Sequence, residues 1–183
     1  GYYQLNDLVA AELHARAVQA QRYACHRISV AHSAFVLAAI HQARDLPEEA
    51  RLVLDRVNEY LVETHSEALL PLVQAFGAEL AASQGDFDTA GRWAATVGPL
   101  VPFGIMAFFY APQLTLPKVL LAMNTPASRQ QAAAALSRLH AFVTETHNTR
   151  FAIEVLALQA MLHHAEGNDP AALQRLEQAV ALA

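Results

Sequence analysis

The chain has 183 residues, a net charge of −5 and a hydrophobic content of 54%. A chain of this length normally forms one domain with a continuous core, so neither a disulfide nor a metal is required for folding. The acidic balance and the scattered lysines and arginines exclude a phosphate-binding stripe, and therefore direct binding of nucleic acid by this segment.

Much of the hydrophobic content is alanine, and there are only seven glycines. Alanine has the highest helix propensity and a side chain small enough to let helices approach closely. The composition therefore predicts closely stacked helices without strands. Cys25 is the one cysteine, which excludes a disulfide within the chain and favours a cytoplasmic location.

In chain order, an N-terminal capping helix is expected first, over about 5–23 within residues 1–26. Four helical pairs are expected to follow, over 27–65, 66–98, 99–147 and 148–183. The first helix of each pair has large apolar residues three or four positions apart and is expected at 28–43, 67–83, 114–123 and 149–166. The second helices are expected within 45–57, 85–97, 128–142 and 167–183. This makes about nine helices.

The second helices share a sequence pattern in which a small residue follows a turn. Ala50, Ala90, Ala135 and Ala172 are separated by 40, 45 and 37 residues, a spacing that fits one helical pair per repeat. Glycine turns precede two of these helices, at Gly85 and Gly167. The fold class predicted is all-α, a superhelix of tetratricopeptide-like helix-turn-helix repeats, in a single domain over 1–183.

Residues 93–117 contain no charged side chain, and their length alone permits a membrane span. Four prolines and two glycines interrupt the segment, and proline removes a backbone hydrogen bond that lipid cannot replace. We therefore expect no membrane insertion. Two interpretations of the aromatic residues here stay open: the rings fill the inside of the superhelix, or they form a lid over a ligand.

The sequence contains none of the patterns that predict an enzyme. The nine histidines include no H-E-x-x-H, no G-x-S-x-G nucleophile motif occurs, and both phosphate-binding glycine motifs are absent. We therefore expect no catalytic residues, no metal site and no cofactor in this segment.

Three strings carry a resemblance to a known family: AASQGDFDTAGRWA from residue 81, QLTLPKVLLA from residue 113, and IEVLALQAMLHHAEGNDPAALQRLEQAVALA from residue 153. Over about 78–183 the chain resembles the helical sensor domain of the large ATP-dependent LuxR-type transcriptional regulators, like the activator of the maltose regulon. The resemblance implies a segment between a nucleotide-binding switch and a DNA-binding domain, where a small inducer binds and promotes self-association. The start at Gly1 and the end at Ala183 in mid-pattern lead us to expect a fragment of such a regulator.

Two functions follow as hypotheses. The first is an effector-sensing and self-association domain that binds a small-molecule inducer; the alternative is a scaffold that binds a protein or peptide. Helical phase places candidate ligand contacts on the first helices and on the proline-interrupted segment within 93–117. These candidates are Phe76, Glu79, Phe109, Tyr110, Gln113, Lys118, Phe151 and Glu154.

Overall fold

The computed structural model describes residues 2–97 and 110–183, and it confirms the predicted all-α repeat fold. Within these ranges the helices, in chain order, are α1 (Leu8–Ala20), α2 (Arg27–Ala43), α3 (Pro47–Glu63), α4 (Leu70–Ser83), α5 (Phe87–Thr96), α6 (Thr115–Met123), α7 (Pro126–Glu145), α8 (Thr149–Ala165) and α9 (Asp169–Leu182). Short 3₁₀ turns, η1 (Glu67–Leu69) and η2 (Pro112–Leu114), lead into α4 and α6.

The starts of α1, α5, α7, α8 and α9 are capped by local side chains that accept hydrogen bonds from otherwise unpaired amides. Asp7 accepts from the amide of Ala10 at 3.0 Å, which begins α1 three residues later than the sequence pattern predicted. Asp86 caps α5 in the same way. Thr125 and Ser128 cap α7 reciprocally, each side chain accepting from the other's backbone amide.

The turns that follow α2, α3, α4, α6, α7 and α8 share one backbone conformation. Gly85 and Gly167 follow α4 and α8 with φ of 79° and 76°, in the left-handed region that glycine enters without a steric penalty. Four non-glycine residues adopt it after α2, α3, α6 and α7, namely Asp45, His65, Asn124 and His147. The residue after Gly85 donates its amide to the carbonyl of Ala81 at 2.9 Å, which closes the turn so that the next helix returns antiparallel.

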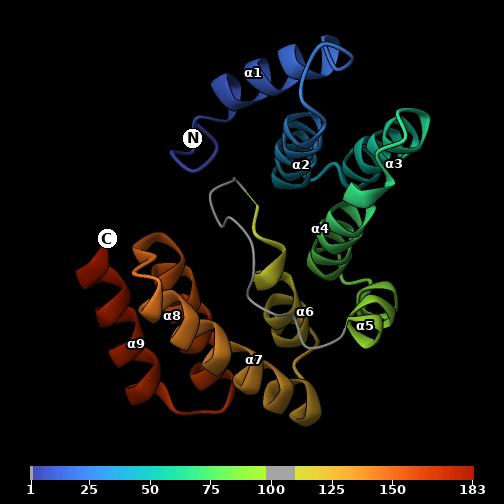
Figure 1. Ribbon diagram of the computed structural model, residues 1–183. Helices are drawn as coiled ribbons and strands as arrows, with labels where there is room; N and C mark the ends of the chain where they lie inside the picture. The colour runs from blue at the N-terminus through green and yellow to red at the C-terminus, as the bar shows by residue number, and fades with distance from the viewer. Residues whose placement is uncertain (1, 98–109) are drawn as a thin grey trace.

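The helices form a curved array with an inner and an outer layer (Figure 1). The first helices of the pairs, α2, α4, α6 and α8, lie on the inside, whereas α3, α5, α7 and α9 lie on the outside. Inner helices contact one another in the order α2–α4–α6–α8, and each outer helix between them contacts the inner helix on either side. Both ends of the chain lie on the same side of the array.

Two large cores hold the array together. The first joins α2, α3 and α4, with Phe35, Leu61 and Val73 almost completely buried. The second joins α6, α7 and α8 around Leu136 and Phe151. Small residues such as Ala90 on α5 fill a third cluster beside α6, where a larger side chain would separate the helices.

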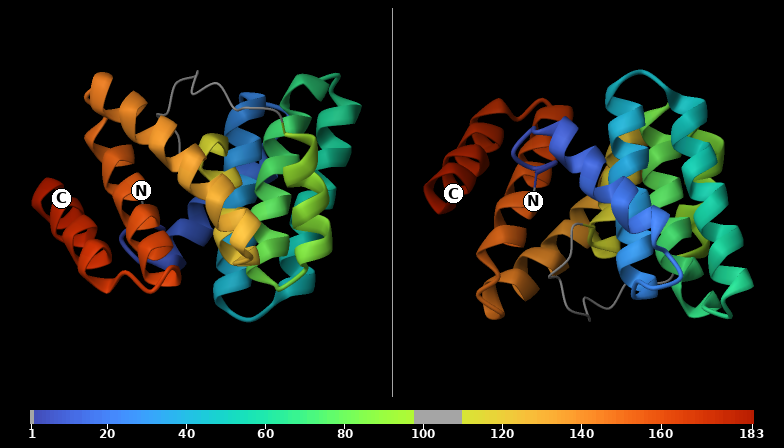
Figure 2. Two further views of the ribbon diagram at one scale, coloured as in Figure 1. Left: turned by 90° about the horizontal axis from the view of Figure 1, so that it is seen from below. Right: turned by 90° about the horizontal axis from the view of Figure 1, so that it is seen from above.

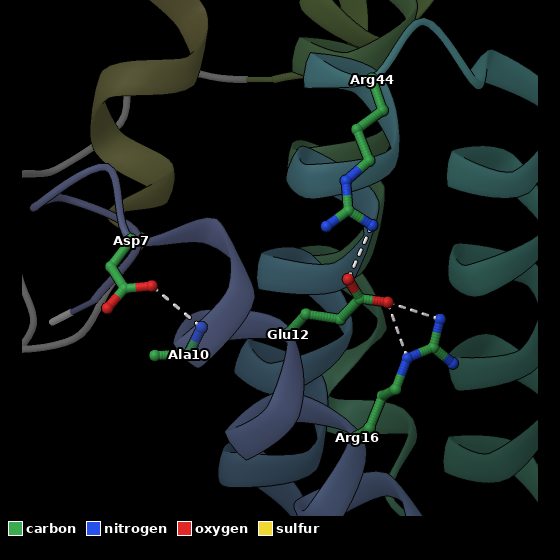
Figure 3. Close-up of polar contacts among 5 residues, drawn as sticks. All are labelled: Asp7, Ala10, Glu12, Arg16 and Arg44. Carbon is green, nitrogen blue, oxygen red and sulfur yellow. Dashed lines mark hydrogen bonds and ion pairs between the residues drawn. The ribbon is translucent and has the colours of Figure 1, made fainter.

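Helix α1 packs against α2, and polar contacts toward both ends of α2 fix it there (Figures 2 and 3). Glu12 lies between two arginines: Arg16 on its own helix at 2.7 Å and Arg44 at the end of α2 at 2.6 Å. Gln19 donates to the carbonyl of Val30 and the hydroxyl of Ser33 on α2. No helix within residues 2–97 and 110–183 is both long and apolar enough to cross a membrane.

Candidate functional site

A pocket of about 430 Å³ opens on the inner surface of the array, and we call it the groove pocket. All four inner helices and the N-terminal segment contribute to it. Its lining residues are Tyr3, Gln4, Ala39, Gln42, Ala43, Phe76, Glu79, Leu80, Ser83, Tyr110, Lys118 and Glu154. The volume lies in the range of small-molecule sites.

Helical periodicity explains why these side chains meet. On α4, positions 76, 79, 80 and 83 repeat at the three- and four-residue spacing that defines one helical face. On α2, positions 39, 42 and 43 do the same, with two alanines that leave room beside Gln42. The pocket is therefore made by the faces of helices that the repeat fold turns inward.

Aromatic rings form the floor of the groove pocket. Phe76 stacks on Phe35 with ring centroids 4.5 Å apart, and Tyr110 meets both rings edge-on at 5.1 and 5.3 Å. Phe35 is completely buried and Phe76 is 7% exposed. These rings give the pocket a rigid apolar base, and only part of Phe76 is available to a ligand.

A network of polar side chains lies beside these aromatic rings. Glu79 accepts from the ammonium group of Lys118 at 2.7 Å and from the hydroxyl of Thr115 at 3.2 Å. Thr115 also bonds the hydroxyl of Tyr110, and because the proton of Thr115 is directed to Glu79, the phenol is the donor. The side chains of Lys118 and Glu79 are 32% and 26% exposed, so they can still contact a ligand.

Burial shifts two acid groups in the pocket. The pKa of Tyr110 lies well above its usual value because the ring is buried and the charge of Glu79 is close, so the phenol stays protonated. Burial also raises the pKa of Glu154, and the nearby charges of Lys118 and Arg150 partly oppose this shift. The pocket thus combines one ion pair, a second carboxyl that binds protons more readily than usual, and neutral hydroxyl and amide groups.

The family profile described as "MalT-like TPR region", where TPR denotes the tetratricopeptide repeat, matches residues 2–183. The chain belongs to the MalT-like TPR family. Comparison with curated proteins and with solved structures gave no significant match. Within this MalT-like TPR region, the family match begins before residue 78, where the sequence resemblance began, and covers the first repeats as well.

The structure brings five of the eight predicted ligand contacts of this MalT-like TPR region into the groove pocket: Phe76, Glu79, Tyr110, Lys118 and Glu154. Phe109 lies outside the described residues. Gln113 belongs to η2 and does not line the pocket.

Phe151 was placed on the wrong face of α8. It is 1% exposed and belongs to the core shared with α6 and α7. The pocket-lining positions of α8 are Glu154, in the groove pocket, and Arg150, in a neighbouring pocket four residues earlier, so the expected phase was one residue in error at the start of the helix.

Sequence reasoning missed the contributions of Gln42, Ser83 and the N-terminal segment. Ser83 could have been found by extending the helical phase, because it lies on the same face of α4 as Phe76 and Glu79, whereas no residue of α2 was proposed from which Gln42 could have been found. Tyr3 and Gln4 carry no local signal, since they reach the pocket only through the position of α1 against α2. Among the residues that the structure describes, no three His, Cys, Asp or Glu side chains are placed to hold a metal ion.

Proposed function

We propose that this MalT-like TPR region is the effector-sensing segment of a bacterial LuxR-type transcriptional activator, and that a small-molecule inducer binds in the groove pocket. The observation that carries the proposal is the composition of this pocket from all four inner helices. A molecule bound there contacts helices from both halves of the array. Occupancy would therefore change how the repeats are held relative to one another, which is the property a sensor needs.

The chemistry of the groove pocket favours a polar ligand with an apolar face. Phe76 and Tyr110 offer a ring surface, while Glu79, Lys118 and Glu154 offer acceptors and a donor around it. Two carboxylates face one ammonium group, so the pocket suits an uncharged or zwitterionic molecule rather than a strong anion. We propose that the segment works by binding alone, in the cytoplasm, without a cofactor or catalysis of its own, and that inducer binding promotes self-association.

Isothermal titration of the 183-residue chain against sugars, amino acids and aromatic metabolites tests this proposal. Glu154→Gln removes the charge of a pocket carboxyl while keeping its shape, and Glu145→Gln is the matched control on the exposed surface of α7. We expect one class of compound to bind, with affinity reduced roughly tenfold or more by Glu154→Gln and unchanged by Glu145→Gln. A folded chain that binds nothing on this panel would contradict the proposal.

A second candidate, the protein or peptide scaffold, is favoured by a groove of about 430 Å³ on the outer side, between α3, α4 and α5. Arg51, Asn58, Gln74 and Trp93 are among the residues that line it, and they suit a peptide backbone. Trp93 is the one tryptophan of the chain, so its fluorescence reports on this groove. A partner bound here should shift Trp93 emission, whereas an inducer in the groove pocket, which Trp93 does not line, should leave it nearly unchanged.

A further inference from the structure

A second pocket lies beneath α1, and we call it the α1 pocket. It has a volume of about 410 Å³ and is enclosed by α1, α2, the N-terminal segment and the first turn of α8. Tyr3 and Gln4 separate it from the groove pocket, because both residues line both pockets. The proposed inducer site makes no use of it.

The electrostatics of the α1 pocket differ sharply from those of the groove pocket. No carboxylate is present among the described residues that line it. Its polar lining includes two histidines and one permanent cation, the guanidinium of Arg150. Burial lowers the pKa of His32 to about 4, so this imidazole is neutral near pH 7 and can serve as a hydrogen-bonding group without charge.

Arg150 is the residue that indicates a ligand. Its Nη2 atom is buried and has no hydrogen-bond acceptor. Its Nε atom lies 4.0 Å from the carboxylate of Glu154, a distance at the outer limit of an ion pair. The guanidinium is supported from beneath by the ring of Phe151, 5.0 Å from the ring centroid. Arg150 lines the pocket with a side chain that is 39% exposed, so the guanidinium can be reached by a ligand, and a carboxylate is the partner that its planar fork matches.

The faces of α1 and α2 that line the α1 pocket are mostly apolar. Ala11, Ala15, Val18 and Val36 contribute small aliphatic groups from α1 and α2. Tyr2, which also lines the pocket, stacks on His14 with ring centroids 5.1 Å apart and nearly parallel planes. The hydroxyl of Ser33 is engaged, since it accepts from Gln19 and donates to the carbonyl of Val30. A ligand here therefore meets one cation at the α8 end and hydrocarbon along α1.

We propose that the α1 pocket binds a small organic acid, with its carboxylate on Arg150 and an aromatic or aliphatic body beneath α1. This site is distinct from the proposed inducer site in the groove pocket and does not depend on it. The groove pocket contains two carboxylates that disfavour an anion, whereas the α1 pocket contains none among its described lining. Because the N-terminal segment lines both pockets, a ligand in one pocket would affect binding in the other.

Titration of the intact chain near pH 7 with benzoate and phenylacetate tests the proposal, with benzamide and phenylacetamide as uncharged controls of the same shape. We expect the carboxylates to bind roughly tenfold or more tightly than the amides, because the charge-assisted pair with Arg150 is lost in the amides. Equal binding of acids and amides, or no binding of either acid up to its solubility limit, would overturn the proposal.

Variants locate the site. Arg150→Gln should abolish the preference for acids, Arg150→Lys should retain part of it, and Arg138→Gln, on the exposed side of α7, should behave as the wild type. Glu154→Gln should bind benzoate at least as tightly, because it removes a competing partner of Arg150. Circular dichroism confirms that each variant is folded. An unchanged acid preference in a folded Arg150→Gln protein, or a loss of benzoate binding in Glu154→Gln, would refute the assignment.

Discussion

The groove pocket and the α1 pocket are nearly equal in volume and share Tyr3 and Gln4, yet they differ in charge. The groove pocket holds Glu79, Lys118 and Glu154, whereas the α1 pocket has Arg150 as its permanent charge. One step of four residues along α8, from Arg150 to Glu154, separates the two environments. The same repeat fold thus places pockets of different charge side by side. Individual residues, and not the fold, determine which ligand each pocket can bind.

The largest expected effect comes from the ring that supports both pockets. Phe35 stacks on Phe76 in the groove pocket and contacts the imidazole of His32 in the α1 pocket edge-on. Phe35→Ala should lower the free energy of unfolding by about 3–5 kcal/mol, because it leaves a cavity in the core. Urea denaturation measures this change. Phe87→Ala, at a 44% exposed position, should change it by no more than about 0.5 kcal/mol; equal losses would contradict the shared role of Phe35.

The second largest expected effect is a loss of stability at low pH, and it comes from the α1 pocket alone. Because the pKa of His32 is about 4 in the folded chain and near 6.5 when unfolded, the unfolded chain binds a proton first as the pH falls. Stability should therefore decrease between pH 6.5 and about pH 4, by up to about 3 kcal/mol from this residue. Urea titrations across this range should show a smaller decrease in His32→Gln and an unchanged one in His26→Gln. A His32→Gln protein with the wild-type pH dependence would exclude this source.

A third prediction concerns the groove pocket alone. Thr115→Val leaves an oxygen of Glu79 and the hydroxyl of Tyr110 without their partner in a completely buried position. We expect a loss of about 1–3 kcal/mol in the free energy of unfolding. Chemical denaturation at neutral pH gives the value. Thr144→Val, where the hydroxyl is exposed and bonds only a backbone carbonyl, is the matched control, and a comparable loss there would contradict the network.

The smallest effect concerns the attachment of α1. Hydrogen bonds from Arg16 and Arg44 hold the pKa of Glu12 below its usual value, so the ionised carboxylate stabilises the folded chain. Glu12→Gln should cost less than about 1 kcal/mol near pH 7, because these pairs are partly exposed. The difference from wild type should vanish as the pH falls through the folded pKa of Glu12. Denaturation at both pH values, with Glu177→Gln as an unpaired control, tests whether this triad fixes α1.

Much of the fold could be predicted from the sequence, because the helices carry local signals. The alanine pattern, the turns at Gly85 and Gly167 and the apolar periodicity each depend on residues close in the chain. The turns at His65 and His147 have the same left-handed backbone without a glycine, so only the periodicity of the flanking helices indicated them. Their conformation is imposed by the packing of the helices on either side.

The candidate site was only partly predictable. Helical phase was sufficient for Glu79 and Lys118, which lie well inside their helices, but it failed for Phe151 close to the start of α8. The contribution of Tyr3 depends on how α1 packs against α2, and the ion pair between Glu12 and Arg44 that secures this packing joins residues 32 positions apart. Such long-range geometry has no counterpart in local sequence patterns.

The residues that line the groove pocket extend along the chain from Tyr3 to Glu154, although repeat helices otherwise contact mainly their neighbours. In such arrays stability is a sum of repeat and nearest-neighbour terms, and one end can open while the other stays folded. A molecule held by the N-terminal segment, α4, α6 and α8 together would add a link between distant repeats. Binding would then make the array unfold as a single cooperative unit, and protection against hydrogen exchange would rise in the outer helices, which do not line the groove pocket.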